Sequence, residues 1–299
     1  MSTLSVLIEA SSVSWGKLAT EHGNRTIGTI MRALVSFCNS HLAQSASNQL
    51  LVFAYGRNIT RTMIYSSGRS EDRDMSALVV ERLSDILRDD AVGDDAKVGV
   101  PLGPALSHAF CHMKKHSRVT TAEQCADSLG PQSTSTGAEE AASEKTSTTR
   151  AVVVSMTPIL GSEHGPLMNL FFSAAKQSIC VDVVSMGEDV TGGVLQQAAD
   201  ITGGLFAHVQ RPPQLLKLLM THMLTDPIYR IAFSKVSSDS VDYRASCVCH
   251  HTLVSSGYVC SVCLSVLCKY TPICKVCRAT FTMRNLPTTA TRRKRAIAQ

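Results

Sequence analysis

The chain has 299 residues, of which 44% are hydrophobic and 18% charged, and a formal net charge of +5. This length is enough for about two folding units, and the composition is typical of neither a disordered nor a fibrous protein. No stretch approaches the roughly 20 apolar residues that a membrane span needs. The first ten residues lack a basic region and contain Glu9, so we expect a strand there and not a signal peptide.

Short apolar runs alternate with longer amphipathic stretches along the first 240 residues. Strands are expected at residues 4–9, 49–55, 59–66, 151–156, 179–184 and 205–209, and helices at about 25–45, 79–87, 102–113, 167–174, 195–201 and 215–224. Strands that alternate with helices form a parallel sheet with helices on both faces. The sequence therefore predicts an α/β fold, with one doubly wound, mostly parallel sheet over residues 1–240.

Residues 117–149 interrupt this alternation. The segment is rich in Ser, Thr, Ala and Glu, and the part from Gly130 to Thr149 has no large apolar side chain. Such a segment cannot bury enough surface to offset its ordering entropy. We expect a flexible surface insertion within the first domain, because the strand and helix pattern resumes directly after it.

The carboxyl ends of the strands are where a doubly wound sheet binds its ligands. A phosphate-binding loop, a nucleophile elbow and a zinc-binding HExxH helix are all missing from the sequence, and we assign no catalytic residue. A von Willebrand factor A domain places Asp-x-Ser-x-Ser after its first strand to hold Mg²⁺, whereas the five positions from Glu9 read Glu-Ala-Ser-Ser-Val and keep only Ser11. Because Mg²⁺ demands tight octahedral geometry, we favour a vestigial site at Glu9 and Ser11 over a metal-dependent adhesion site, and expect no bound Mg²⁺.

Three histidines recur at a helical spacing in the expected helix at 102–113 and just beyond it: His108, His112 and His116. Two such side chains can bind a metal ion, but a solvated polar stripe is the simpler interpretation. Trp15 is the only tryptophan, and the sequence leaves open whether it anchors a partner or packs in the core. Cys38 and Cys180 lie on apolar patterns and are interpreted as core residues.

Seven of the eleven cysteines fall within 31 residues near the C-terminus. Four of them form two Cys-x-x-Cys pairs separated by ten residues: Cys260, Cys263, Cys274 and Cys277. A two-residue gap lets one tight turn present both sulfurs to a single tetrahedral Zn²⁺, and four protein ligands leave no open position for water. The spacing therefore predicts one structural zinc ion in a small Cys-rich module at residues 241–284.

The remaining cysteines interleave with these pairs in the order of a cross-braced module, but one ligand is missing. They are Cys247, Cys249 and Cys268, and either His250 or His251 can supply the fourth ligand. Alternatively this second site is degenerate and Cys268 is a packed thiol. One zinc ion is therefore predicted, with a second as the open alternative. About 35 residues bury too little core to fold without metal, and the many apolar residues of this module favour docking on a partner.

The charge is concentrated near the C-terminus, where residues 241–299 carry nine Lys or Arg and one acid. A basic tail is expected at residues 285–299, and its densest run is Arg292, Arg293, Lys294 and Arg295. We interpret this run as a nuclear-import signal, because no aromatic residue is interleaved with the charges. Direct contact with DNA phosphates is the alternative, and it would make binding strongly salt-dependent.

The Cys-rich segment resembles a known family. Residues 242–250 (DYRASCVCH), 257–265 (GYVCSVCLS) and 272–274 (PIC) are similar to the C-terminal zinc finger of the smaller von Willebrand A-like subunit of the transcription and DNA-repair factor TFIIH. The turn Trp15-Gly16-Lys17 and the late segment from Gly203-Gly204 through Leu215 and Leu219 to Pro227 also resemble that family. The resemblance covers almost the whole chain, and its zinc segment is the most specific part.

The resemblance implies a von Willebrand A-like domain and a non-catalytic, nuclear scaffold subunit of the TFIIH core. Its implied partners are the larger von Willebrand A-like subunit, which carries a RING-like module, and the other core subunits together with the helicases. Its implied roles are transcription initiation by RNA polymerase II and nucleotide excision repair. The alternative is a RING-like ubiquitin ligase or another zinc-finger adaptor, and the incomplete ligand series argues against a ligase.

Overall fold

The computed structural model describes residues 2–57, 59, 62–68, 74–92, 100–127, 148–159, 161–186, 193–232, 241–250 and 252–281. The chain divides into two compact units, residues 1–243 and 244–299, close to the expected boundary after residue 240. Among the described residues, no helix is both long enough and apolar enough to cross a membrane.

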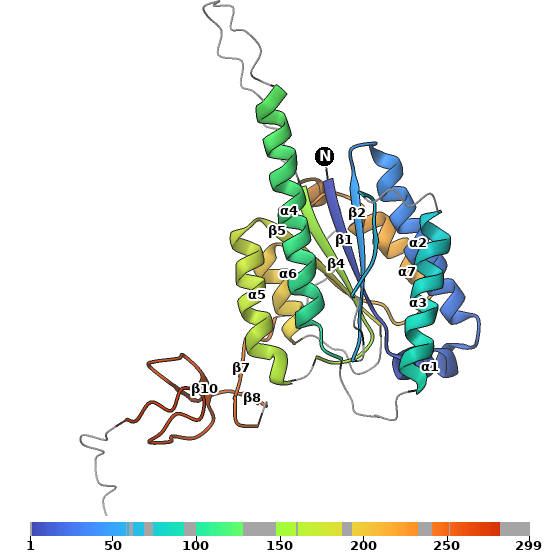
Figure 1. Cartoon of the computed structure of the whole chain (residues 1–299). Coiled ribbons are helices and arrows are strands. Elements are labelled where there is room, and N and C mark those ends of the chain that lie inside the picture. Colours follow the sequence, from blue (N-terminus) through green and yellow to red (C-terminus); the bar gives the residue numbers. More distant parts are fainter. Residues whose placement is uncertain are drawn as a thin grey trace, which may run out of the picture. The chain divides into compact units, whose positions relative to one another are not determined.

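The first unit is built on one six-stranded sheet (Figure 1). Its strands are β1 (Ser2–Glu9), β2 (Gln49–Tyr55), β3 (Met63–Ser66), β4 (Thr148–Ser155), β5 (Ile179–Ser185) and β6 (Phe206–His208), in the spatial order β3-β2-β1-β4-β5-β6. All neighbouring strands are parallel except β3, which is an antiparallel edge strand beside β2. The predicted doubly wound, mostly parallel sheet is confirmed.

Helices cover both faces of this sheet (Figure 1). One face carries α1 (Ser12–His22), α2 (Thr26–Gln44), α3 (Met75–Val92) and α7 (Gln214–Leu218), which a π-helical turn, η2 (Leu219–Met223), continues. The other face carries α4 (Gly103–Asp127), α5 (His164–Lys176), which follows the 3₁₀ turn η1 (Gly161–Glu163), and α6 (Val194–Thr202). The last described element of the unit is a 3₁₀ turn, η3 (Pro227–Ala232).

The four central strands, β1, β2, β4 and β5, are buried on both faces because two cores flank the sheet. Along β1, Leu4, Val6 and Ile8 face the core under α1, α2 and α3, whereas Leu7 faces the core under α4 and α5. This alternation is the two-residue period of a strand. Cys38 and Cys180 are buried, and burial raises the pKa of each thiol to about 12, so both are inert core residues as expected.

Three local predictions differ from the structure. Trp15 lies in the helix α1 and not in a turn. The insertion is shorter than the predicted segment 117–149, because α4 continues to Asp127 and β4 begins at Thr148. Residues 128–147 lie outside the described residues. The expected helix at 215–224 consists of α7 and the π-helical turn η2, and Pro227 begins a separate turn, η3, which carries Arg230.

Buried ion pairs tie the end of this unit to the sheet. Arg230 makes a bidentate pair with the buried Asp182 of β5, with both N–O distances 2.6 Å. Asp182 Oδ1 also accepts the backbone N–H of Leu205 at 2.9 Å. Arg150 of β4 is buried and donates to the carbonyls of Met223 and Thr225 at 2.9 and 2.8 Å, so it satisfies carbonyls at a helix end.

The described part of the second unit, residues 244–250 and 252–281, has very little regular structure. It contains four two-residue strands, paired as two antiparallel ladders: β7 (Ala245–Ser246) with β8 (Leu253–Val254), and β9 (Tyr258–Val259) with β10 (Val266–Leu267). Its buried residues are mainly Cys247, Cys260, Leu267 and Cys274. A unit with so small an apolar core needs another source of stability.

Candidate metal centre

The same backbone turn occurs three times in the second unit and presents cysteine sulfurs each time. The N–H of Cys247, of Cys260 and of Cys274 each donates to the carbonyl five residues later, at 3.0, 3.0 and 2.9 Å. In the second turn the N–H of Leu264 donates to the carbonyl of Cys260 at 2.8 Å, and in the third turn the N–H of Arg278 donates to the carbonyl of Cys274 at 2.9 Å. Both residues have a left-handed backbone, with φ of 58° and 59°. These turns place the sulfurs on one side of each loop.

The four cysteines of the two Cys-x-x-Cys pairs come together as one group. Their Sγ atoms all lie within 4.8 Å of one another. The measured contacts are 3.6 Å between Cys260 and Cys277 and 3.7 Å between Cys263 and Cys274. Four sulfurs at about 2.3 Å from a tetrahedral Zn²⁺ lie about 3.8 Å apart. The spacing of these sulfurs therefore fits a four-thiolate zinc site.

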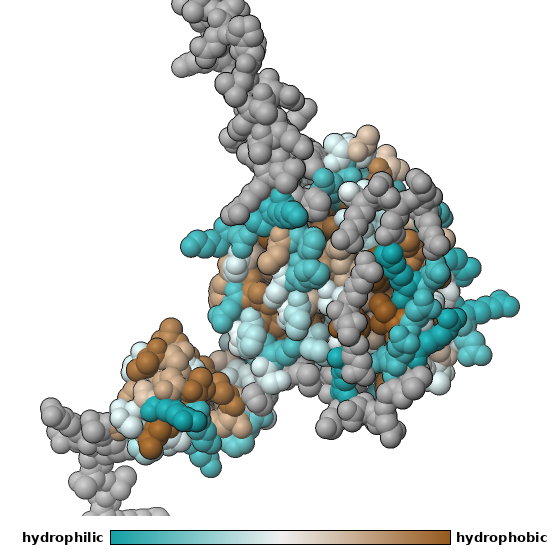
Figure 2. Space-filling view, viewed as in Figure 1, coloured by the Kyte–Doolittle hydropathy of each residue, from teal (hydrophilic) through white to brown (hydrophobic). Residues whose placement is uncertain are grey.

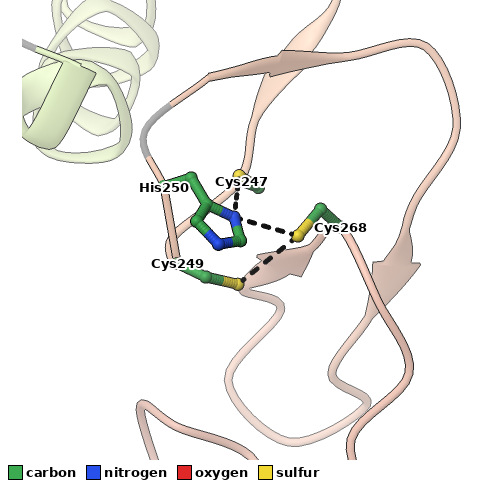
Figure 3. A group of neighbouring side chains, drawn as sticks. All are labelled: Cys247, Cys249, His250 and Cys268. Atoms are coloured by element: carbon green, nitrogen blue, oxygen red, sulfur yellow. Dashed lines mark hydrogen bonds between the residues drawn. The ribbon is translucent and has the colours of Figure 1, made fainter.

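The other three clustered cysteines form a second group with His250 (Figure 3). His250 Nδ1 lies 3.8 Å from Cys247 Sγ and 3.2 Å from Cys268 Sγ, and the sulfurs of Cys249 and Cys268 lie 3.9 Å apart. All four ligand atoms point toward a common centre (Figure 3). Of the two histidines left open by the sequence, His250 completes the group, and His251 lies outside the described residues.

The two groups interleave along the chain. The second group contributes ligands before and after the 260–263 pair, because Cys268 reaches back to the Cys247 turn across the β9–β10 hairpin. This is the ligand order of a cross-braced module. In such a module, the ligands of each site are separated in the sequence by ligands of the other site, so the two sites fold together. The two groups of the described residues can therefore each hold a metal ion with four protein ligands.

Local donors favour the thiolate form that binds metal. Hydrogen bonding by the Thr252 side chain, 3.6 Å from the sulfur, and by its backbone lowers the pKa of Cys247 to about 5. The backbone N–H of Cys277 and then the Ser265 hydroxyl lower the pKa of Cys274 to about 6. Because the thiolate is the metal ligand, these donors prepare the sulfurs of Cys247 and Cys274, one in each group, for an ion.

The predicted vestigial magnesium site lies at the end of β1 and is filled by protein donors. Glu9 is fully buried, and its Oε2 accepts the N–H groups of Met156 and Thr157 at 2.7 and 3.0 Å. Its Oε1 accepts the hydroxyls of Ser14 and Thr157 at 2.8 and 2.9 Å. Ser11 contributes only its carbonyl, which accepts the N–H of Trp15 at 3.1 Å. The carboxylate thus joins β1 directly to the loop after β4.

Trp15 belongs to the same arrangement. It is buried, and its Nε1–H donates to the carbonyl of Glu9 at 2.8 Å. Of the two roles that the sequence left open, packing is the one that the structure shows. The basic run at residues 292–295 lies outside the described residues.

Comparisons with known proteins agree with this architecture. A sequence model of the family described as transcription factor Tfb4 matches residues 1–278. The chain is 30% identical to the Saccharomyces cerevisiae TFB4 subunit of the general transcription and DNA repair factor IIH, over 94% of this chain and 86% of that one. It is 27% identical to the Kluyveromyces lactis TFB4 subunit, over 94% of this chain and 85% of that one. The crystal structure of the TFIIH p34 N-terminal domain matches with a TM-score of 0.53 at 23% identity, over 74% of this chain and 96% of that one. Since the family model spans most of the chain, the chain belongs to the Tfb4 family of TFIIH subunits.

Proposed function

We propose that the C-terminal module is a two-zinc, cross-braced clamp that docks this TFIIH subunit on other core subunits, foremost the larger von Willebrand A-like subunit. As a Tfb4 family member, the chain is a structural subunit of the TFIIH core in transcription and DNA repair. The observation that carries the proposal is the completion of the second ligand group by His250, which gives both ligand groups four members. Zinc suits both groups, since thiolate and imidazole are its usual structural ligands.

Metal content tests this part of the proposal. Full-length protein purified without chelators is expected to contain two zinc ions per chain by plasma mass spectrometry. Cys263→Ser and Cys268→Ser are each expected to remove one ion, because each leaves three ligands where four are needed. Cys111→Ser is the matched control, since Cys111 is an exposed cysteine outside both groups. A natural chain that contains only one ion, or a Cys268→Ser variant that contains as many ions as the natural chain, would overturn the second site.

Exposed apolar side chains cover the module (Figure 2). Val259 is 60% exposed, Val262 66%, Leu264 73% and Ile273 55%. Tyr258 and Tyr270 are also exposed and pack edge to face at 5.8 Å. A small module rarely exposes so much apolar surface unless it binds another protein.

The charge of the module supports a protein partner over nucleic acid. Residues 244–281 contain no acid and four Lys or Arg. Two zinc ions with seven thiolates and one neutral imidazole add about −3, so the loaded module is close to neutral. Phosphate recognition needs a strongly basic surface, which this module lacks once zinc is bound.

Co-purification tests the docking surface. Leu264→Asp is expected to lower the yield of the complex with the larger von Willebrand A-like subunit at least tenfold, because it places a charge in an apolar contact. Asp tolerates the left-handed backbone of position 264 better than Leu, so the turn itself is kept. Ser261→Asp is the control, since it adds the same charge to an exposed polar position of the same turn. Equal yields from both variants and the natural chain would contradict the docking role.

The nucleus is the proposed location, as membership of TFIIH implies. Replacing Arg292, Arg293, Lys294 and Arg295 together by Ala in a fluorescent fusion is expected to slow nuclear entry of the free subunit. Unchanged entry would show that this run is not the import signal.

The ubiquitin-ligase alternative is not kept. In the sequence, the main argument against a ligase is the missing ligand of the second group. That argument no longer holds, because His250 completes the group. Family membership argues against a ligase instead, since the members of the Tfb4 family are structural TFIIH subunits.

A further inference from the structure

Two histidines of α4 meet beside β2, far along the chain from the cysteine groups. His108 and His112 are four residues apart and therefore lie on one face of the helix. Their Nε2 atoms are 3.0 Å apart and their ring centroids 4.7 Å apart, with the ring planes at 70°. His108 is exposed and His112 half-buried, and their Nε2 atoms share a hydrogen bond.

Both rings are held by neighbours on the sheet. Phe53 of β2 packs against His108 at 5.5 Å and against His112 at 6.2 Å between centroids. Thr62 Oγ1, just before β3, lies 2.6 Å from His108 Nδ1. The tautomer that ligates a metal through Nε2 carries its proton on Nδ1, where the threonine oxygen accepts it. A second hydrogen bond of this kind is what orients metal-binding imidazoles in proteins.

The distance between the nitrogens selects a type of ion. With metal–nitrogen bonds of about 2.0–2.1 Å, a separation of 3.0 Å gives an N–metal–N angle of about 95°. A tetrahedral ion would need nitrogens about 3.3 Å apart. Neighbouring positions of a square-planar or octahedral ion fit better, and imidazole pairs with that geometry suit Ni²⁺ and Cu²⁺.

We propose that His108 and His112 form an open binding site for a late first-row divalent cation, with His108 positioned by Thr62 and the remaining coordination positions left to water or to a ligand from outside. The site is independent of the cysteine groups and of the docking proposal. Acid should release the cation, because an imidazolium ion has no lone pair to donate.

Nickel titration of the zinc-loaded, full-length protein without a tag tests the proposal, because Ni²⁺ does not oxidise thiols as Cu²⁺ does. Calorimetry is expected to show one bound Ni²⁺ per chain with no zinc released to a colorimetric chelator. His108→Gln and His112→Gln should each weaken binding at least tenfold, and Thr62→Val by roughly tenfold, as expected for loss of the orienting partner. His22→Gln, at an exposed position of α1, should change nothing.

A second measurement needs no variant. Diethylpyrocarbonate modifies accessible imidazoles, and Ni²⁺ is expected to protect His108 and His112, but not His22, when the modified sites are mapped by mass spectrometry. The proposal is overturned if saturable nickel binding is absent, if nickel uptake is matched by zinc release, or if the two histidine variants bind as tightly as the natural chain.

Discussion

Replacing Glu9 tests how much its buried carboxylate contributes to the free energy of unfolding of the first unit. Its oxygens accept hydrogen bonds from residues of α1 and from the loop after β4, 147 and 148 positions later in the sequence. Glu9→Ala removes the acceptor while the N–H groups of Met156 and Thr157 remain in place. Glu9→Gln keeps the shape and one carbonyl oxygen, and so separates the loss of charge from the loss of the acceptor.

The geometry gives the size of each effect. An unsatisfied buried N–H costs about 1–3 kcal/mol, so the two donors left by Glu9→Ala cost about 2–6 kcal/mol. For a unit of this size, about 4 kcal/mol lowers Tm by roughly 8–16 °C. In Glu9→Gln the amide oxygen can keep both N–H bonds and the hydroxyls of Ser14 and Thr157 can turn to accept from the amide nitrogen. We therefore expect only about 1–2 kcal/mol, the difference between charged and neutral acceptors.

Urea unfolding followed by tryptophan fluorescence measures both variants. Trp15 is the only tryptophan of the chain, and its indole N–H donates to the carbonyl of residue 9 itself, so the signal reports the first unit alone. Addition of Mg²⁺ to the natural chain should leave the transition unchanged, because protein donors already occupy the carboxylate. A loss below about 1 kcal/mol in Glu9→Ala, or equal losses in the two variants, would refute this reasoning.

Three further predictions concern zinc, buried charge and pH. Chelation of zinc should expose residues 244–281 to proteolysis yet leave the tryptophan-detected urea transition in place, because the sheet has its own two cores. Asp182→Asn should cost about 3–5 kcal/mol, since it leaves the guanidinium of Arg230 without its buried counter-ion, whereas Asp85→Asn, in an exposed pair, should cost less than about 1 kcal/mol. Burial, and then the charge of Arg150, lower the pKa of His41 below its ordinary value of 6.5, so the unfolded chain binds this proton more readily. Stability should therefore fall as the pH drops below about 6.5, and His41→Leu should flatten that fall in urea titrations between pH 7 and 5.

Local patterns in the sequence were enough for the architecture and for the first ligand group. Apolar runs such as residues 49–55 identify strands buried on both faces, and their alternation with helices fixes a doubly wound sheet. Likewise, the two-residue gap places the sulfurs of Cys260 and Cys263 in one turn, where both could bind the same ion. The helix α1 was missed because only Ser14, Trp15 and Leu18 of its eleven residues are buried, too few for a clear helical period.

Contacts between distant residues were decided only by the tertiary structure. The choice of His250 over its neighbour depends on where Cys268 arrives, 18 residues later, after the intervening hairpin has folded. The N–H donors to Glu9 and the threonine beside His108 likewise come from segments 46 or more positions away. Spacing along a chain constrains only side chains within a turn or two of each other, whereas these partners are set by the packing of whole elements. The residue types at both places were visible in the sequence, but their neighbours, and hence their chemistry, were not.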